Sequence, residues 1–382
     1  MTKHLYDRIQ VLEREDELDR QQRLKAMARP LLENPILNEM AEPLMAWYRN
    51  HKRDLPWRRN PDAYRVWVSE IMLQQTRVEA VKPYFERFMA ALPTVQALAA
   101  VEDDRLMKLW EGLGYYTRAR NLKKAALMIT ERHGGELPGS YEALLALPGI
   151  GSYTAGAIAS IAFGLPVPAV DGNVLRVISR VLADREDIRQ PSVKARMERE
   201  LKEIMPRERT SQYNQGLIEV GAIVCVPGGE PRCGECPMES ICLTRRQGLW
   251  KEIPVRGALK KRKVEELTVC LIRRGEEVAI HKRPDTGLLA SLYELPNVPG
   301  HLEPDQVPGA FGLSADLVEA VEPLPAAKHI FSHVEWHMAG YAVSLREGGE
   351  MNREGAFFFV ERSAVKGEYP LPGAFKAYTK LI

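Results

Sequence analysis

The fold of the longer, N-terminal part of the chain is decided by the stretch Leu147-Pro-Gly-Ile-Gly-Ser-Tyr-Thr-Ala-Gly156. Its two glycines, Gly149 and Gly151, predict a tight hairpin that opens directly into a helix of small residues. Backbone amides exposed at a hairpin and at a helix N-terminus form an anion site suited to a phosphate. A turn that needs glycine for steric reasons alone gives the same pattern. Both interpretations place a hairpin between two helices.

Helical patterns surround this hairpin on both sides. Short Gly- and Pro-containing segments separate them, and no alternating strand pattern occurs before residue 264. We therefore expect residues 37–245 to form an all-α domain. Three-to-four-residue apolar spacing predicts its helices over residues 44–49, 66–73, 78–91, 104–109, 119–132, 152–163, 174–182 and 192–204.

The periodicity changes after residue 264. Strands are predicted over residues 267–272, 278–281, 340–345 and 356–360. Residues 265–382 are therefore expected to form a separate α+β domain, joined to the first by a linker over residues 246–264. Residues 244–263 hold eight basic residues and one acidic residue, a local net charge of +7 in a chain whose total is +2. Such a segment either follows a DNA backbone or is a solvated tether.

Length and composition set the frame for these domains. A chain of 382 residues with 45% hydrophobic and 27% charged residues is typical of a globular protein of two to three domains. Residues 1–36 are predicted to be a charged N-terminal extension, solvated or loosely docked. No uncharged apolar stretch of 18 residues and no secretory h-region occur, so we expect a cytoplasmic protein with no membrane partner.

The cysteines are crowded into one short strip. Four of the five, Cys225, Cys233, Cys236 and Cys242, lie within 18 residues, with spacings of seven, two and five intervening residues. In an intracellular chain, crowded thiols more often bind metal than form disulfides. A single continuous strip of soft ligands favours an iron–sulfur cluster. A zinc site and unligated thiols remain as alternatives.

Two carboxylates stand out from their surroundings. Glu70 interrupts the apolar run 66–73, where burial would favour its protonated form. To donate a proton at neutral pH, its pKa must lie about two to three units above its usual value, which corresponds to roughly 3–4 kcal/mol. A glutamate on a polar helix edge is the alternative. Asp171 precedes an apolar helix, as either an N-cap or a fixed carboxylate near a developing positive charge.

Polar and aromatic residues at two helix junctions could contact a ligand. Residues 76–79, Thr-Arg-Val-Glu, predict a capping box that puts Gln74 and Gln75 between two helices. Amides there can bind a base edge or be satisfied within the loop. Tyr115 and Tyr116 follow glycines and offer aromatic surface, with core packing as the alternative.

Taken together and in order, these motifs resemble the helix-hairpin-helix DNA glycosylases that carry a cysteine cluster, and among them the adenine DNA glycosylase (MutY) family. The resemblance runs from about residue 37 to the C-terminus. It is carried by Leu55-Pro-Trp-Arg58, Trp67-Val-Ser-Glu-Ile-Met-Leu-Gln-Gln-Thr-Arg77, Gly112-Leu-Gly-Tyr-Tyr116, Leu147-Pro-Gly-Ile-Gly151, Val170-Asp-Gly-Asn173 and the cysteine strip.

The resemblance implies a multidomain protein. Its all-α helix-hairpin-helix glycosylase domain would carry a 4Fe–4S cluster, and an α+β Nudix-like (MutT-like) domain would follow. The implied reaction is hydrolysis of the N-glycosidic bond of adenine mispaired with 8-oxoguanine or guanine in duplex DNA, within base excision repair. Chemistry on a base requires its extrusion from the duplex. The enzyme is expected to act as a monomer at the nucleoid of a bacterial-type cell.

The resemblance also assigns roles to single residues. Glu70 would protonate adenine N7 and later activate water, and Asp171 would stabilise the oxocarbenium-like sugar. Bifunctional relatives place a lysine where this chain has Tyr153, so a monofunctional glycosylase is expected. The other implied residues are Asn173 beside the carboxylates, Trp57, Arg58, Leu73 and Gln215 in an adenine pocket, Gln75, Tyr115, Gly149 and Gly151 on DNA, and Cys225, Cys233, Cys236 and Cys242 on the cluster.

The C-terminal domain is expected to recognise the lesion. Its stretch from His281 to Pro296 resembles the MutT-like domain of the family, but the glutamate-rich magnesium signature is missing downstream. Binding is therefore expected there, not pyrophosphate hydrolysis. Phe331, Ser332 and His333 match the loop that senses 8-oxoguanine, with Ser332 as the expected contact. A relative that removes another base, or a non-catalytic DNA-binding iron–sulfur protein, are the alternatives.

Overall fold

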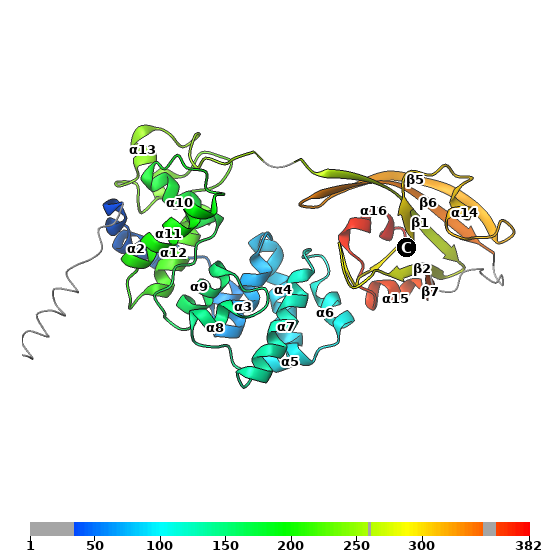
Figure 1. The fold of residues 1–382 in the computed structure, drawn as a ribbon, viewed down its shortest axis with the longest axis horizontal. Helices are drawn as coiled ribbons and strands as arrows, with labels where there is room; N and C mark the ends of the chain where they lie inside the picture. The colour runs from blue at the N-terminus through cyan, green and yellow to red at the C-terminus, as the bar shows by residue number, and fades with distance from the viewer. Residues whose placement is uncertain (1–33, 259–260, 347–356) are drawn as a thin grey trace, which may run out of the picture.

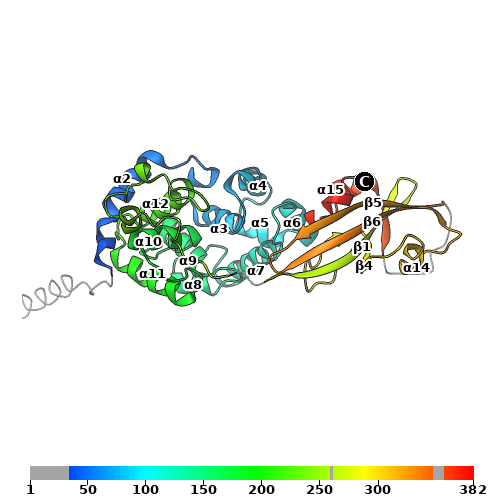
Figure 2. The ribbon, with the colours of Figure 1, turned by 90° about the horizontal axis from the view of Figure 1, so that it is seen from above.

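The structure, a computed structural model, describes residues 34–258, 261–346 and 357–382. It is elongated, with a helical domain at one end and a β-rich domain at the other (Figures 1 and 2). Most of the predicted N-terminal extension, residues 1–33, lies outside the described residues. None of the helices in the described part of the chain is long and apolar enough to cross a membrane.

The first domain is all-α, as predicted. The predicted helix over residues 78–91 has the same bounds in the structure, and the others differ by a few residues at their ends. The elements are η1 (Pro35–Glu39), α2 (Ala41–His51), η2 (Pro56–Arg58), α3 (Ala63–Leu73), α4 (Val78–Ala91), α5 (Val95–Ala100), α6 (Asp103–Trp110), α7 (Thr117–Arg132), α8 (Tyr141–Leu145), α9 (Ser152–Ile161), α10 (Gly172–Leu182), α11 (Pro191–Ile204), α12 (Thr210–Ile223), η3 (Cys233–Glu235) and α13 (Leu243–Gln247).

Two hydrophobic cores divide this domain into two lobes. One core is built from α3 to α9, around fully buried aromatic residues such as Trp67, Phe85 and Trp110. The other combines η1 and α2 with α10 to α12 and the loop over residues 224–241, around residues such as Met45 and Tyr213. The described chain therefore passes from the second lobe to the first and back to the second.

The described residues of the second domain form a mixed sheet of seven strands. Along the main path the order is β3-β2-β1-β6-β5, with β1 and β6 parallel; β4 pairs with β1 and β7 with β2. Its elements are β1 (Lys263–Arg274), β2 (Glu277–Lys282), β3 (Tyr293–Glu294), β4 (Asn297–Pro299), α14 (Val307–Ala310), β5 (Val318–Ile330), β6 (Val334–Leu345), β7 (Phe358–Glu361), α15 (Arg362–Gly367), η4 (Gly373–Phe375) and α16 (Lys376–Thr379).

The central strand β1 has apolar residues facing both sides, because a separate hydrophobic core covers each face of the sheet. Strand β5 was not predicted from the sequence. It holds Pro323 and Pro325, and its pairing with β6 is interrupted by register shifts. Prolines are tolerated because β5 lies at the edge of the sheet, where one side of the strand needs no ladder partner.

The two domains are joined by direct contacts on α6 and α7. Leu292, from the β-rich domain, is fully buried in the core of the first helical lobe. Asp104 on α6 accepts a hydrogen bond of 3.0 Å from the Tyr293 hydroxyl and pairs with Lys282 at 3.0 Å. On α7, Arg120 donates to the backbone carbonyl of Ala290 at 2.6 Å. The β-rich domain is thus seated on the helical domain as well as tethered to it.

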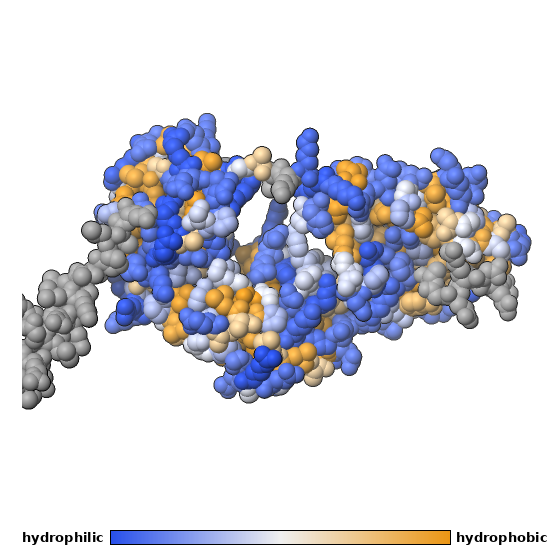
Figure 3. Space-filling model, in the orientation of Figure 1, coloured by the Kyte–Doolittle hydropathy of each residue, from blue (hydrophilic) through white to orange (hydrophobic). Residues whose placement is uncertain are grey.

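Much of the segment between the domains is packed against the second helical lobe. Arg180 donates to the carbonyl of Ile253 at 2.8 Å, Ile188 N–H bonds the carbonyl of Val255 at 3.2 Å, and Gly257 N–H bonds Asp187 at 3.0 Å. Residues 253–257 are therefore not a solvated tether. The basic residues 261–263 are exposed. Figure 3 shows a hollow beneath this segment that is bordered mostly by hydrophilic residues.

Candidate active site

A cleft of about 1200 Å³ lies between the two helical lobes. It is lined by η2, α3, α9, α10 and α12, so residues far apart in sequence meet there. The structure brings together in this cleft all the predicted catalytic and adenine-pocket residues and one predicted DNA-binding residue: Trp57, Arg58, Glu70, Leu73, Gln75, Tyr153, Asp171, Asn173 and Gln215.

Glu70 is held within the apolar helix α3 and is only 7% exposed. The hydroxyl of Tyr153 on α9 donates a 2.6 Å hydrogen bond to its Oε2. Burial raises the pKa of Glu70 to about 7, and the nearby Asp171 charge adds to this; the Tyr153 bond and the charge of Arg58 act in the opposite direction. Glu70 can therefore exist in both protonation states near neutral pH.

Asp171 is the N-cap of α10, one of the two roles that its sequence position allowed, and it also lines the cleft. As the N-cap of α10, its Oδ1 accepts hydrogen bonds from the backbone N–H groups of Asn173 and Val174 at 2.9 and 2.8 Å. Its Oδ2 accepts one from the Asn173 side chain at 2.7 Å. Burial raises the pKa of Asp171 despite these bonds, which favour the charged form. The carboxylate is thus fixed in orientation at the cleft.

Two glycines let α9 and α12 pack closely against the segment that carries Asp171. A Cβ atom on Gly156 of α9 would lie 2.4 Å from the carbonyl oxygen of Pro168, in the segment that leads to Asp171. A Cβ atom on Gly221 of α12 would lie 2.6 Å from the Cβ of Asn173. Both distances are too short for a larger residue. These glycines therefore set the position of the N-terminus of α10 against α9 and α12.

Arg176 connects the cleft to the cysteine strip, and sequence analysis did not single it out. Its Nη2 donates to Asn173 Oδ1 at 2.8 Å, and Asn173 in turn holds Asp171. Its Nε donates to the carbonyl of Cys225 at 2.8 Å. Its role depends on a carbonyl some fifty residues away, so no local sequence pattern indicates it.

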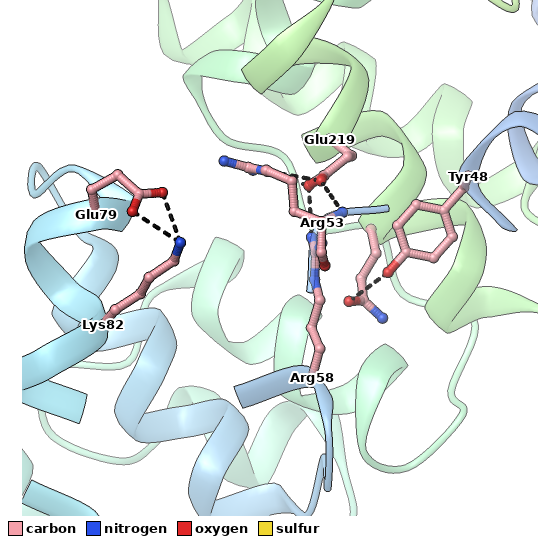
Figure 4. A network of polar contacts seen from close by, with 7 residues as sticks. Tyr48, Arg53, Arg58, Glu79, Lys82 and Glu219 are labelled. Carbon is pink, nitrogen blue, oxygen red and sulfur yellow. Dashed lines mark hydrogen bonds and ion pairs between the residues drawn. The ribbon is translucent and has the colours of Figure 1, made fainter. Parts of the chain in front are cut away.

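A buried ion-pair network forms one wall of the cleft (Figure 4). Glu219 on α12 has a fully buried side chain that pairs with Arg58 at 2.8 Å and with Arg53 at 2.8 Å. Burial alone would raise the pKa of Glu219, but the bonds to the two arginines prevail and lower it to about 2. Neither Glu219 nor α12 was predicted from the sequence, although Glu219 gives the same signal as Glu70, an acid inside an apolar helix.

The amide of Gln215 has a fixed orientation in the same wall. The Tyr48 hydroxyl donates to Gln215 Oε1 at 2.9 Å, and Gln215 Nε2 donates to Ser211 Oγ at 2.9 Å (Figure 4 draws the bond from Tyr48). Because both ends of the amide are engaged, its flat face and remaining lone pair are presented in a constant position. Such an amide can select a ligand by hydrogen bonding.

A second, smaller cavity of about 190 Å³ groups three of the four predicted DNA-binding residues, Gln75, Tyr115 and Gly149. Gln75 and Tyr115 both have left-handed backbone conformations, with φ of 58° and 49°. Gly149 has φ +77°, and a Cβ there would lie 2.7 Å from that of Asn121, so this glycine is sterically required. Gly151 has open space beside it, so sterics do not explain the second glycine.

The predicted capping box is wrong. The N-cap of α4 is Arg77, and no side chain caps that helix. Thr76 Oγ1 instead donates to the carbonyl of Gln74 at 3.4 Å and accepts from Arg118 at 3.3 Å. Thr76 therefore stabilises the loop between α3 and α4 and not the helix that follows it.

The four cysteines of the strip line one cavity of about 340 Å³ in the second lobe. Arg180 donates to Cys225 Sγ at 3.3 Å, and Cys242 Sγ donates to the carbonyl of Arg180 at 3.3 Å. Within the described ranges, no three His, Cys, Asp or Glu side chains gather closely enough to hold a single metal ion. Thiols spread around a cavity suit a multinuclear cluster better than a tetrahedral zinc ion, whose Zn–S distance is about 2.3 Å.

The predicted lesion-recognition residues lie away from the cleft, in the turn between β5 and β6. The tip of this hairpin is on the side of the helical domain (Figure 1). Phe331 packs edge-on against Trp336, with ring centroids 4.9 Å apart. Ser332 and His333 are exposed, with Ser332 Oγ 3.3 Å from His333 Nδ1. Two polar side chains are thus presented at the tip of this hairpin.

Comparisons with known proteins agree with this architecture. Residues 68–207 match the HhH-GPD superfamily base excision DNA repair proteins, and residues 268–381 match the NUDIX domain. An adenine DNA glycosylase of Homo sapiens is 34% identical over 364 residues, covering 79% of this chain and 66% of the human protein, about two thirds of its length. One of Mus musculus is 36% identical and covers 79% of this chain and 70% of the mouse protein. A thermostable thymine-DNA glycosylase structure, 26% identical with a TM-score of 0.50, covers 54% of this chain and 95% of that chain.

Proposed function

Because this chain belongs to the adenine DNA glycosylase family of base excision repair enzymes, we propose that it removes adenine mispaired with 8-oxoguanine or guanine from duplex DNA. One observation carries this proposal: Glu70 and Asp171, about a hundred residues apart in sequence, line the same cleft. Glu70 has a pKa of about 7, and Asp171 is fixed by three hydrogen bonds. A proton donor and a fixed anion are what cleavage of a glycosidic bond requires.

The mechanism follows from the proton that Glu70 can carry and from the fixed position of the Asp171 carboxylate. The protonated Glu70 donates its proton to adenine N7, and the bond between N9 and C1′ breaks with its electron pair moving into the purine. The carboxylate of Asp171 stabilises the positive charge that develops on the sugar. Glu70, now ionised, accepts a proton from water as the water oxygen bonds to C1′. The products are free adenine and an abasic site.

Tyr153 supports a monofunctional reaction. Strand cleavage through a Schiff base requires an amine, and a phenol cannot form an imine. At its position beside Glu70, the tyrosine hydroxyl instead donates a hydrogen bond that orients the carboxyl group. We therefore expect base removal without efficient strand cleavage.

The remaining residues of the cleft would select the base. Trp57 and Leu73 offer apolar surface, while Arg58 and the oriented amide of Gln215 offer hydrogen bonds. The exposed Ser332 at the β5–β6 turn would contact 8-oxoguanine on the opposite strand. The hydrophilic hollow between the domains and the basic residues 261–263 would accommodate the duplex (Figure 3). Such a substrate places the enzyme at the chromosome, where it would act as a monomer.

The cysteine strip would hold a 4Fe–4S cluster through Cys225, Cys233, Cys236 and Cys242. When bound, the cluster would supply iron–thiolate bonds that tie the loop from η3 to α13 against α10. Arg180 already bridges these parts, through its bonds to Cys225 and from Cys242. The cluster would therefore stabilise the position of α10, which lines the cleft.

The function is tested by incubating the protein with an A:8-oxoguanine duplex, treating with alkali and measuring strand breaks at the adenine. We expect breaks with A:8-oxoguanine and A:G and none with a T:G duplex. A T:G preference would instead support a relative that removes another base, like the thymine-DNA glycosylase whose helical fold this chain shares. No release of any base would support the non-catalytic alternative. A visible spectrum of the same sample identifies the metal.

A further inference from the structure

One guanidinium joins the two loops that carry Gln75 and Tyr115. Arg118 lies in the first turn of α7, beneath both loops. Its Nη1 donates to three carbonyls at the C-terminal end of α3, and its Nη2 donates to two carbonyls of the loop before α7. The acceptors and distances are Ile71 at 2.8 Å, Met72 at 2.9 Å, Gln74 at 2.6 Å, Leu113 at 3.0 Å and Gly114 at 3.0 Å.

Two of these five acceptors directly precede Gln75 and Tyr115, which both have left-handed backbones. The carbonyl of Gln74 belongs to the peptide unit that leads into Gln75, and the carbonyl of Gly114 to the one that leads into Tyr115. A left-handed conformation of a non-glycine residue persists only where its surroundings hold it. Arg118 supplies that restraint for both residues at once.

The aromatic neighbours of Arg118 strengthen this arrangement. Its guanidinium lies 5.4 Å from the ring of Trp110 and 5.5 Å from the ring of Tyr115. The Trp110 indole N–H donates to the carbonyl of Gly114 at 3.1 Å, so it secures the same loop. Burial lowers the pKa of Arg118 to about 10, and the side chain remains charged at neutral pH. The Tyr115 ring, 47% exposed, therefore packs against a positive charge whose position is fixed.

We infer that Arg118 is a positioning residue for base extrusion, because it sets the separation and orientation of Gln75 and Tyr115 as the pair that enters the base stack. The inference rests on the proposed function, in which both residues contact DNA at the mispair. Lysine cannot replace this arginine, since an ammonium group is a single point with three donors, whereas the planar guanidinium forks toward two separate loops.

The test measures base extrusion separately from bond cleavage. A duplex with 2-aminopurine in place of the adenine, opposite 8-oxoguanine, reports unstacking by its fluorescence, and single-turnover adenine release reports the overall reaction. Arg118→Lys is compared with the native protein and with Arg65→Lys, a control on α3 whose arginine makes one 3.5 Å bond to the carbonyl of Pro56. The same Arg118→Lys change is also made in a Gln75→Ala, Tyr115→Ala background.

We expect Arg118→Lys to slow extrusion at least about tenfold in the native background and less than about twofold in the background without the two side chains. The slowing caused by Arg118→Lys should be smaller for an adenine in a one-nucleotide bulge, because such an adenine costs less free energy to extrude. Arg65→Lys should match the native protein. Equal slowing by Arg118→Lys in both backgrounds, or no slowing in either, would overturn the inference.

Further outcomes separate this inference from the proposed function. If the native protein releases no adenine from any duplex, the proposed function fails. If it releases adenine but the Gln75→Ala, Tyr115→Ala variant extrudes the base normally, the function stands and the positioning role is overturned. Arg118→Gln, which keeps two donors, serves as the second variant. If neither Arg118 variant folds by circular dichroism, the residue is required for the fold itself and the positioning role is also overturned.

Discussion

Replacing Tyr153 by phenylalanine should move the pH dependence of adenine release toward higher pH. The Tyr153 hydroxyl donates a 2.6 Å hydrogen bond to Glu70, and a bond to the charged form of a carboxyl group lowers its pKa. Burial outweighs this bond, so the pKa of Glu70 is about 7. Without the hydroxyl, the lowering contribution disappears, and the pKa of Glu70 must rise.

The size of the change follows from the strength of this bond. A hydrogen bond to a charged group contributes about 1.5–3 kcal/mol, or roughly one to two pKa units. Since the reaction needs protonated Glu70, activity falls as the pH rises through its pKa. From a pKa of about 7, the protonated fraction at pH 8 is about 9%, and a rise of one unit makes it about 50%. Relative to its own low-pH plateau, Tyr153→Phe should be about fivefold more active at pH 8 than the native protein.

Single-turnover adenine release from an A:8-oxoguanine duplex, measured across pH 5.5–9 (roughly two units around the pKa), is the assay. Tyr48→Phe is the matched control, because it removes a phenol from the same cleft that bonds Gln215 and not Glu70. Its pH profile should keep the native position even if its rate changes. A Tyr153→Phe profile at the native position, or shifted to lower pH, would refute the assignment of Glu70 as the proton donor.

Four further outcomes are expected. Glu70→Gln should slow adenine release by at least about a hundredfold, and a loss of less than about threefold in single-turnover rates would contradict general acid catalysis. Glu219→Gln leaves Arg53 and Arg58 without their buried partner and should destabilise the protein by about 3–5 kcal/mol, seen as a lower Tm; an unchanged Tm would argue against the network. If about five phosphates are neutralised, log affinity for DNA should fall with log salt at a slope near −4 to −5, whereas a flat response would exclude a phosphate-binding role for the basic segment. Ser332→Ala should reduce the preference for A:8-oxoguanine over A:G while A:G activity stays unchanged; equal losses on both duplexes would show that Ser332 does not sense the lesion.

The parts of the fold that sequence patterns predicted well are those whose apolar spacing is strong. Helix α4 was predicted with its observed bounds, and Glu70 was recognised as an acid inside an apolar helix. Helix α12 was missed because Gly216 and Gly221 interrupt its apolar pattern, although both glycines are required by close packing. Strand β5 was missed because its prolines argue against a central strand, and only the finished sheet shows that it lies at the edge.

The site was predictable only where a residue type carries its own chemical signal. An acid in an apolar helix and a crowded set of cysteines can each be recognised from a short stretch of sequence. Arg118 and Arg176 do not, because their function consists of bonds to backbone carbonyls of distant segments. Any arginine on a helix gives the same local pattern, so these two were found only from the packed structure.

The burial of Leu292 in the helical domain has a consequence for how this protein can be divided. Because that side chain completes a core formed by the other domain, removing the β-rich half would leave an apolar hole on α6 and α7 open to water. A shortened protein would therefore melt at a lower temperature and self-associate more readily than the same helices within the whole chain. A polar substitution at Leu292 would therefore weaken a core whose other residues lie more than a hundred residues earlier in the chain.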